Sequence, residues 1–358
     1  MTELLRIGVV GSGIGRGHVE AFQSLPDQFS VQAICDVDGS KARALASEFS
    51  IPRLTTDITE LCGMDDLDVI DICTPSHLHY EQVLLALEAR KHVICEKPVA
   101  GSLKQVDELV VAEKKSGQRV MPIFQFRFGH GAQKLKFLID EGIAGRAYLT
   151  TAETAWRRKA DYYAVPWRGK WETELGGPMV TLAIHAHDLV HYIVGPARRV
   201  FACTATLVNP IETEDCVAAS LEMADGSLCA LAVTTGSAQQ ISRHRFCFRN
   251  LTAESHTQPY SNTSDPWKFT GDSPEFQQRI DETLTRFIPL PEGFAGQFYR
   301  FYHALQDNSA LPVTLADARA SLELITAVYY AAHTRQVADL PIDRDHPWYA
   351  GWRLDGQR

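Results

Sequence analysis

Long hydrophobic runs are absent from this chain of 358 residues. None approaches the ~20 apolar residues that a membrane-spanning helix needs, and the apolar stretch at residues 7–10 is too short for the core of a signal peptide. Positive charge is also scarce, because 35 lysines and arginines face 44 acidic residues and give a formal net charge of −9. Since nucleic-acid phosphates require a basic face, we expect neither a membrane nor a nucleic acid as partner.

Closely spaced cysteine pairs are missing as well. The eight cysteines form no CxxC motif, and Cys35, Cys73 and Cys95 end apolar runs that are typical of buried strands. Disulfide frameworks and zinc sites usually place their cysteines at short, regular spacings. Buried free thiols in a reducing compartment explain the pattern better, so we expect a cytoplasmic protein.

Strand and helix signals alternate up to residue 125, which predicts a parallel sheet with crossover helices. The expected strands are residues 6–10, 31–35, 69–73, 93–95 and 120–124, and the expected helices are 18–25, 42–49, 77–89 and 102–116. The chain is long enough for a second domain after this one.

Longer strand signals dominate after residue 125, behind an expected helix at 131–141. The expected strands here are residues 146–155, 198–207, 215–223, 227–234 and 243–249. Asp225-Gly226 between two of them is a hairpin signal, which favours a mostly antiparallel sheet. The polar residues 250–275 predict a long surface loop, and apolar stripes predict helices at 294–305 and 316–334.

A glycine cluster follows the first expected strand and opens the first expected helix. Its sequence is Gly11-Ser12-Gly13-Ile14-Gly15, with the spacing GxGxG in place of GxGxxG. Glycines at such a turn let the backbone approach a pyrophosphate, which the helix N-terminus then binds; a plain tight turn is the alternative. Asp36 ends the second strand, where a carboxylate accepts hydrogen bonds from a ribose 2′-hydroxyl and repels a 2′-phosphate. Together these features predict a dinucleotide site for NAD.

Further motifs resemble the glucose–fructose oxidoreductase / inositol dehydrogenase (Gfo/Idh/MocA) family over nearly the whole chain. The motifs are Thr74-Pro75-Ser76-His77-Leu78-His79, Val93-Ile94-Cys95-Glu96-Lys97-Pro98, Gln125-Phe126-Arg127-Phe128, Trp167-Arg168-Gly169, Gly176-Gly177 and Ile184-His185-Ala186-His187-Asp188-Leu189. Glu-Lys-Pro at the end of a strand is the most specific of them. The resemblance implies an α/β protein with an N-terminal Rossmann domain at 1–125 and a C-terminal α/β domain at 126–358. The second domain would carry a large open, mostly antiparallel sheet, bind substrate and form homodimers or homotetramers.

The resemblance also implies roles for individual residues. NAD would contact Gly11, Gly13, Ile14, Gly15, Asp36, Thr74, Pro75, His79, Glu96, Lys97, Gln125, Trp167 and Arg168. A carbohydrate-like substrate would contact Lys97, Arg127, Tyr163, Trp167, Thr181, His185 and Asp188. Lys97 and His185 would be catalytic. The implied activity is NAD-dependent hydride transfer at a ring secondary hydroxyl of a sugar, glycoside or cyclitol.

Oxidising a secondary alcohol requires a base for the hydroxyl proton while hydride leaves the same carbon. Histidine is the side chain that titrates nearest to neutrality, and Lys97 would polarise the reacting oxygen. A structural histidine and a surface lysine at a strand end are the alternative interpretations. The family usually has Asp-x-x-x-His, but Thr181 replaces that aspartate, so His185 lacks the carboxylate that would orient it. The identity of the main base therefore stays open between Lys97 and His185.

Two histidines at helical spacing could bind a metal. His187 and His191 lie four residues apart, a spacing that suits zinc. No third protein ligand is apparent, and the family that this chain resembles uses no metal for catalysis. We therefore expect no metal site.

Aromatic residues gather between Trp156 and Trp171, before the Gly-Gly motif. Tyr162, Tyr163 and Trp167 lie there beside Arg168, and aromatic faces stack on sugar rings while arginine binds hydroxyls. Core packing explains the same residues equally well.

Two other functions remain compatible with the sequence. One is an NADPH-dependent reductase of a sugar ketone or aldehyde, which Asp36 disfavours. The other is a non-catalytic dinucleotide-sensing regulatory protein, which the exchange at Thr181 leaves open.

Overall fold

The computed structural model describes residues 4–352, which divide into two compact units. The first unit takes the described residues up to Phe124 together with Gly293–Arg319. The second takes Gln125–Glu292 and the described residues from Ala320 onward. None of the helices in these residues is both long and apolar enough to cross a membrane.

A six-stranded parallel sheet forms the centre of the first unit, in the order β3-β2-β1-β4-β5-β6. The strands are β1 Leu5–Val10, β2 Phe29–Cys35, β3 Arg53–Thr55, β4 Val69–Ile72, β5 His92–Cys95 and β6 Val120–Pro122. All five pairings are parallel. All four residues of β4 are buried, as expected of a strand covered on both faces. The predicted parallel sheet is confirmed.

Helices connect these strands as crossovers. They are α1 Gly15–Gln23, α2 Gly39–Glu48, α3 Ile58–Cys62, η1 Ser76–Leu78, α4 His79–Glu88 and α5 Leu103–Ser116. Asp38, Asp57 and Ser102 cap α2, α3 and α5 by accepting hydrogen bonds from backbone N–H groups of the first turn. Such caps satisfy amides that would otherwise lack partners.

Helix α12, Gly293–Gln306, joins the first unit although it follows the second in sequence. Its Phe298 stacks on Phe22 of α1, with ring centroids 4.2 Å apart and planes only 9° from parallel. Both rings are fully buried, so this helix contributes directly to the hydrophobic core of the first unit.

An eight-stranded sheet forms the second unit, in the order β13-β12-β11-β7-β10-β9-β8-β14. The strands are β7 Ala147–Arg157, β8 Ala197–Ala205, β9 Cys216–Met223, β10 Leu228–Thr234, β11 Gly236–Phe248, β12 Leu251–Glu254, β13 Lys268–Gly271 and β14 Ala338–Asp339. Among the described strands of this sheet, only β10 and β7 pair in parallel. The expected mostly antiparallel sheet is confirmed, and so is the hairpin at Asp225-Gly226 between β9 and β10.

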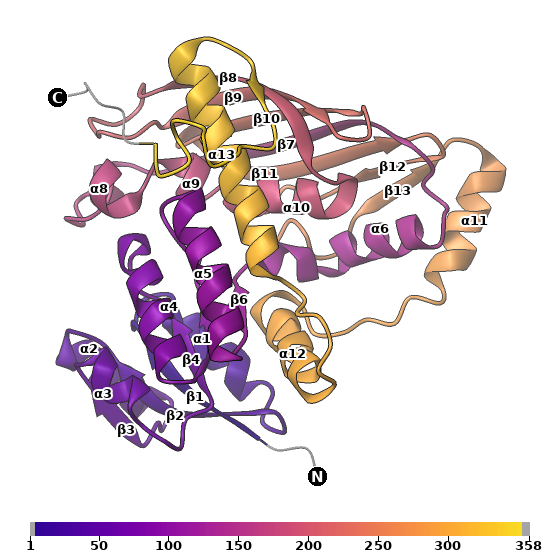
Figure 1. Ribbon diagram of the computed structural model, residues 1–358. Helices are drawn as coiled ribbons and strands as arrows, with labels where there is room; N and C mark the ends of the chain where they lie inside the picture. The colour runs from indigo at the N-terminus through magenta and orange to yellow at the C-terminus, as the bar shows by residue number, and fades with distance from the viewer. Residues whose placement is uncertain (1–3, 353–358) are drawn as a thin grey trace. The chain divides into compact units, whose positions relative to one another are not determined.

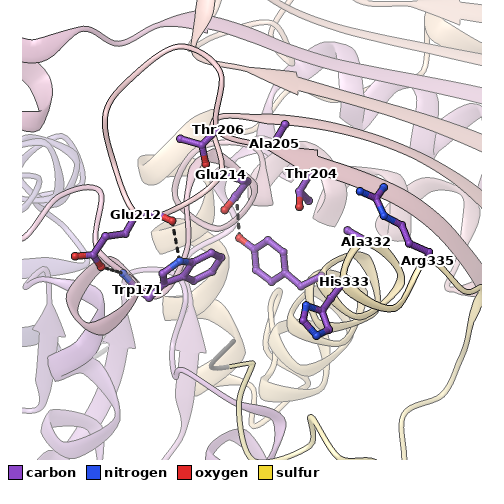
Figure 2. Close-up of a pocket in the computed structure, with 10 residues that line it drawn as sticks. Trp171, Thr204, Ala205, Thr206, Glu212, Glu214, Ala332, His333 and Arg335 are labelled. Carbon is purple, nitrogen blue, oxygen red and sulfur yellow. Dashed lines mark hydrogen bonds between the residues drawn. The ribbon is translucent and has the colours of Figure 1, made fainter. Parts of the chain in front are cut away.

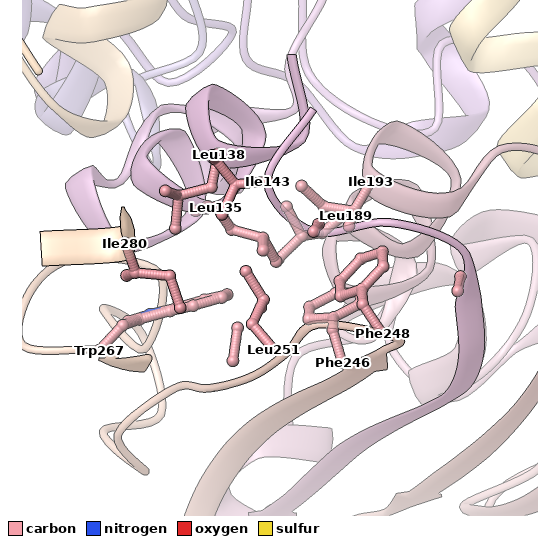
Figure 3. Close-up of a cluster of buried hydrophobic side chains, with 14 residues drawn as sticks. Leu135, Leu138, Ile143, Leu189, Ile193, Phe246, Phe248, Leu251, Trp267 and Ile280 are labelled. Carbon is pink, nitrogen blue, oxygen red and sulfur yellow. The ribbon is translucent and has the colours of Figure 1, made fainter. Parts of the chain in front are cut away.

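Helices cover one face of this sheet, where Figure 1 shows α6 and α10 running alongside the strands. The helices are α6 His130–Asp140, α10 Ile184–Val194 and α11 Pro274–Leu284, and α13 spans Leu315–Thr334. A buried cluster fills the space between α6, α10, α11 and strands β11 and β12 (Figure 3). Its larger members are Leu135, Leu138, Leu189, Ile193, Phe246, Phe248, Leu251, Trp267 and Ile280. Gly131 on α6 is required there, because a Cβ would lie 2.0 Å from the Trp267 ring.

The opposite face of the sheet is exposed. Leu228, Ala230 and Ala232 alternate with buried residues along β10, and Phe201 on β8 is 48% exposed. This regular alternation is typical of an antiparallel sheet that packs on one side only.

The expected surface loop at 250–275 is wrong in part. Two strands, β12 and β13, form an antiparallel pair within it. Leu251 and Ala253 of β12 are 1% and 0% exposed, so two apolar residues among many polar ones suffice to anchor the strand. β13 is an edge strand without a fully buried residue, which explains its polar sequence.

Candidate functional site

Three glycines shape the turn between β1 and α1. Gly11 has a φ of 96°, and a Cβ there would lie 2.6 Å from the Cys73 carbonyl oxygen. A Cβ at Gly15 would lie 3.1 Å from Val9 Cγ1, so Gly15 lets the helix pack closely on the strand. A Cβ at Gly13 would have no atom within 4 Å, which leaves this backbone open to a ligand. These are the three tasks that dinucleotide-binding glycines perform, so the turn fits a pyrophosphate despite its shortened spacing.

Asp36 lies directly beside this turn, after the end of β2. Its carboxylate accepts hydrogen bonds from the backbone N–H of Ser12, at 2.8 Å, and of Asp38, at 2.9 Å. Asp38 in turn caps α2 and is paired with the exposed Lys41. The site therefore has a carboxylate beside the glycine turn, where the adenosine ribose of NAD is expected to bind.

The predicted residues after β4 and β5 lie at the carboxyl edge of the same sheet. Thr74 donates a hydrogen bond to Gln82 at 2.6 Å. The His79 ring lies 2.7 Å from the Thr74 carbonyl oxygen and 2.8 Å from that of Pro98. His79 is only 1% exposed, so it ties the two loops that follow β4 and β5 together. In parallel folds this edge is the place where ligands bind.

Glu96 and Lys97 follow β5 at that edge. Glu96 is buried, and its Oε2 accepts a hydrogen bond of 3.1 Å from the Lys97 backbone N–H. Lys97 is partly exposed. The structure thus brings the glycine turn, Asp36, Thr74, Pro75, His79, Glu96 and Lys97 together on one sheet edge.

In the second unit, His185 lies in the first turn of α10 and is 6% exposed. Its ring stacks on Phe126, with centroids 5.0 Å apart and planes 26° from parallel. Phe126 belongs to η2, Gln125–Phe128, which also contains Arg127. Short contacts between η2 and α10 therefore determine the orientation of His185.

Arg127 and Asp188 form a buried, two-pronged ion pair. Arg127 Nε lies 2.7 Å from one Asp188 oxygen and Nη2 lies 2.5 Å from the other. The two side chains are 5% and 1% exposed, and the guanidinium also lies over the Tyr192 ring. Paired arginine and carboxylate groups of this geometry are rigid, so the pair holds η2 against α10.

Thr181 ends the short helix α9, Pro178–Thr181, and α10 begins only at Ile184. The Thr181 hydroxyl donates to the Gly177 carbonyl oxygen at 3.0 Å. Thr181 and His185 therefore do not belong to one continuous helix, contrary to what their spacing indicates.

Glu214, which the sequence did not single out, anchors the Gly-Gly motif before α9. It accepts hydrogen bonds from the Gly177 N–H at 2.9 Å, the Met179 N–H at 3.1 Å and the Tyr329 hydroxyl at 2.9 Å. A Cβ at Gly177 would lie 1.9 Å from the Glu214 carbonyl oxygen, so only glycine fits. Burial raises the pKa of Glu214 to about 7.

Glu214 also lines a cavity of about 300 Å³ in the second unit (Figure 2). Trp171, Glu212, Tyr329, His333 and Arg335 are among its other lining residues. Trp171 is fixed by a hydrogen bond of 2.9 Å from its indole N–H to the Glu212 carbonyl oxygen. Except for Trp171, these residues carry no recognisable motif, because they come from segments distant in the chain.

The aromatic segment before this cavity is organised around Arg168. Its guanidinium lies 4.3 Å from the centre of the Trp167 ring and 3.9 Å from that of Tyr162. It also pairs with Glu174 at 3.2 Å. Tyr163 lies beside Tyr162, with ring centroids 5.0 Å apart. The structure therefore brings Tyr163, Trp167 and Arg168 into one cluster of the second unit.

One group of side chains in the described residues has the arrangement of a metal site. The ligand atoms of His18, Asp71 and Cys73 lie within 4.8 Å of one another, and all three residues are buried. His187 and His191 do not belong to such a group, and burial lowers the pKa of His187 to about 3. His18 lies just after the glycine cluster, but nothing in its sequence surroundings indicates a role.

Comparison with known proteins identifies the family. Residues 5–124 match the oxidoreductase family with an NAD-binding Rossmann fold, and residues 132–249 match the GFO/IDH/MocA C-terminal domain. An uncharacterized oxidoreductase, YrbE of Bacillus subtilis (strain 168), is 31% identical over 249 residues, which cover 67% of this chain and 69% of the relative. The chain belongs to the Gfo/Idh/MocA family. The expected family, fold class and NAD-binding domain are thereby confirmed.

Two further relatives of this Gfo/Idh/MocA protein have named activities or ligands. The D-glucoside 3-dehydrogenase of Escherichia coli (strain K12) is 33% identical over 195 residues, which cover 53% of this chain and 54% of that enzyme. The WlbA dehydrogenase of Bordetella pertussis, crystallised with NADH and UDP-GlcNAcA, superposes with a TM-score of 0.83 at 28% identity. That comparison covers 95% of this chain and all of the other.

Proposed function

We propose that this Gfo/Idh/MocA protein is a cytoplasmic NAD-dependent dehydrogenase acting on a ring secondary hydroxyl of a sugar, glycoside or cyclitol. The proposal rests on the position of Lys97. This residue follows β5 at the ligand-binding edge of an NAD-binding unit, and its backbone N–H donates a hydrogen bond to Glu96. The D-glucoside 3-dehydrogenase and the WlbA dehydrogenase that was crystallised with NADH and UDP-GlcNAcA support the substrate class.

In this proposal the first unit binds the cofactor. The glycine turn would hold the pyrophosphate, and Asp36 would accept hydrogen bonds from the adenosine ribose. Ile14, Thr74, Pro75, His79 and Glu96 would line the remainder of the sheet edge. The NAD contacts expected at Gln125, Trp167 and Arg168 of the second unit stay predictions. When bound, NAD supplies the acceptor for the hydride.

The reacting alcohol loses a hydride from carbon and a proton from oxygen, and a ketone results. Lys97 would donate a hydrogen bond to that oxygen, which makes the proton easier to remove. His185 would take the proton, and the substrate contact expected at Thr181 stays a prediction. Tyr163 and Trp167 would bind the sugar. The substrate contacts expected of Arg127 and Asp188 stay predictions, and these two side chains are paired with each other in a buried ion pair. No step is assigned to a metal.

A screen of sugars, glycosides and cyclitols for NADH formation, with EDTA present, tests this function. We expect turnover of at least one carbohydrate. If the protein binds NAD tightly but oxidises none of a broad set, the dinucleotide-sensing alternative replaces the enzyme.

The cofactor preference provides a sharper test at Asp36. We expect kcat/KM for NAD to exceed that for NADP by roughly ten- to hundredfold, because a carboxylate close to a 2′-phosphate costs ~1–3 kcal/mol. Asp36→Ser should remove much of this preference for NAD over NADP. Asp38→Asn is the matched control, since it removes a nearby charge but retains a capping side chain. An equal shift in both variants, or a wild-type protein that prefers NADP, contradicts the assignment and favours the NADPH-dependent reductase.

We further propose a homodimer or homotetramer that covers the exposed face of the eight-stranded sheet. Small and apolar side chains on this face, including Phe201, Leu228 and Ala230, support a flat, self-complementary contact. Light scattering should give a mass of two or four chains of 39.8 kDa. Ala230→Glu, which places a charge opposite Ser220 and Thr151, should reduce that mass. A wild-type mass of one chain would exclude the assembly.

A further inference from the structure

A buried histidine lies behind the cofactor edge of the first unit. His18 on α1 is 0% exposed. Its Nδ1 lies 3.0 Å from both carboxylate oxygens of Asp71, and its Nε2 lies 3.3 Å from Glu96 Oε1. Cys73 Sγ lies 3.3 Å from the same Nδ1. One imidazole therefore lies between two carboxylates that come from the ends of neighbouring strands.

The surroundings of His18 favour its charged form. A neutral imidazole has only one N–H donor, whereas here each ring nitrogen faces a carboxylate. Burial alone lowers the pKa of His18, but the charge and hydrogen bond of Asp71, together with Cys73, outweigh it and raise this pKa well above its usual value. The other element packed against the ring is α12, which contributes the apolar rings of Phe294 and Phe298, at 4.4 and 5.3 Å.

Glu96 connects His18 to the backbone of Lys97. While Oε1 of Glu96 faces His18, Oε2 accepts the Lys97 backbone N–H. Glu96 is held at both oxygens, because Oε1 lies within hydrogen-bond reach of the His18 ring and Oε2 accepts from the Lys97 backbone. Asp71 fixes the imidazolium from the other side.

We propose that His18 is a positioning residue that acts through Glu96 to hold Lys97 and the cofactor edge in their productive geometry. This inference rests on the proposed function, in which Glu96 contacts the cofactor and Lys97 contacts the reacting oxygen. It also accounts for the cluster of His18, Asp71 and Cys73 without a metal, since these side chains bind one another. Cys73 is not a nucleophile in this arrangement, because burial keeps its thiol protonated.

A double-mutant cycle between His18→Gln and Glu96→Gln tests the inference. The readouts are the Kd for NADH without substrate, measured by fluorescence, and kcat and KM for the sugar. Glutamine can donate to only one of the two carboxylates, so His18→Gln should weaken NADH binding and lower kcat by about tenfold each, with little change in the sugar KM. Because His18 acts through Glu96, the double variant should be no worse than Glu96→Gln alone.

Val19→Ala is the matched control, since Val19 is the next residue of α1 and is also 0% exposed. It should lower the melting temperature but leave the Kd for NADH unchanged. If His18→Gln does not fold, Asp71→Asn takes its place in the cycle, because it retains His18 and removes the charge that holds it.

The outcomes separate this inference from the proposed function. The positioning role is overturned if the effects of His18→Gln and Glu96→Gln multiply in the double variant. It is also overturned if His18→Gln keeps the wild-type NADH affinity and kcat. The dehydrogenase assignment remains in both cases. A wild-type protein that oxidises no carbohydrate would overturn the dehydrogenase, and the NADH cycle would still decide whether His18 acts through Glu96.

Discussion

Replacing Lys97 by methionine is expected to lower kcat by ~10²–10⁴-fold, the usual range for a positioned group that assists proton transfer. Methionine retains the length and the apolar stem of lysine but offers no hydrogen-bond donor to the reacting oxygen. Because Lys97 is held through its backbone N–H by Glu96, the loop should keep its conformation. NADH binding, measured by fluorescence, should weaken only several-fold.

Lys104→Met is the control for this change in charge. Lys104 lies on α5, is 56% exposed at its side chain and pairs loosely with Glu108. Its variant should retain the wild-type kcat. Near-full turnover by Lys97→Met on a verified substrate would show that the lysine does not act on the reacting hydroxyl.

Replacing His185 by alanine should cost a similar ~10²–10⁴-fold in kcat with little change in NAD affinity. The buried ring is stacked on Phe126, so a variant that fills the space better, His185→Gln, separates loss of the proton acceptor from loss of packing. Both variants should be slow if the imidazole takes the proton. His191→Asn, farther along α10, is the control for a histidine on the same helix.

The combined variant of Lys97 and His185 gives the more decisive measurement. If both groups serve one proton transfer, the double variant should be far less than multiplicatively worse than either single variant. Independent, multiplying losses would assign the two residues to different steps. A His185→Ala protein with normal turnover would leave Lys97 as the main base.

Much of the fold follows from local patterns in the sequence. The alternation of short apolar strands with helices up to residue 125 predicted a parallel sheet, because parallel neighbours need a crossover connection. The glycine turn was equally readable, since a positive φ at Gly11 and close packing at Gly15 exclude other residues. The strands β12 and β13 were not, because a short edge pair needs only Leu251 and Ala253 to anchor it.

The sequence indicated which residue types form the site, but not which of these residues contact one another. The Glu-Lys-Pro motif, Asp36 and the His185 segment were found from the sequence and its resemblance to the family. Nothing in the sequence showed that Arg127 and Asp188, 61 positions apart, bind each other. The four-residue spacing of Thr181 and His185 fits one helix, but they lie on the separate helices α9 and α10.

The sequence by itself therefore determined the alternation of strands and helices in the first unit, the dinucleotide turn and the family. These depend on short-range sterics and on the alternation of apolar residues, which neighbouring positions report. Only the tertiary structure decided which polar groups are buried together. Asp71 and Glu96 lie 53 and 78 positions after His18 in the sequence. The three residues form one charged cluster because parallel strands bring their carboxyl ends to one edge of the sheet while α1 packs behind it. The cost of burying each charge alone is what makes such partners necessary, and only the folded chain selects them.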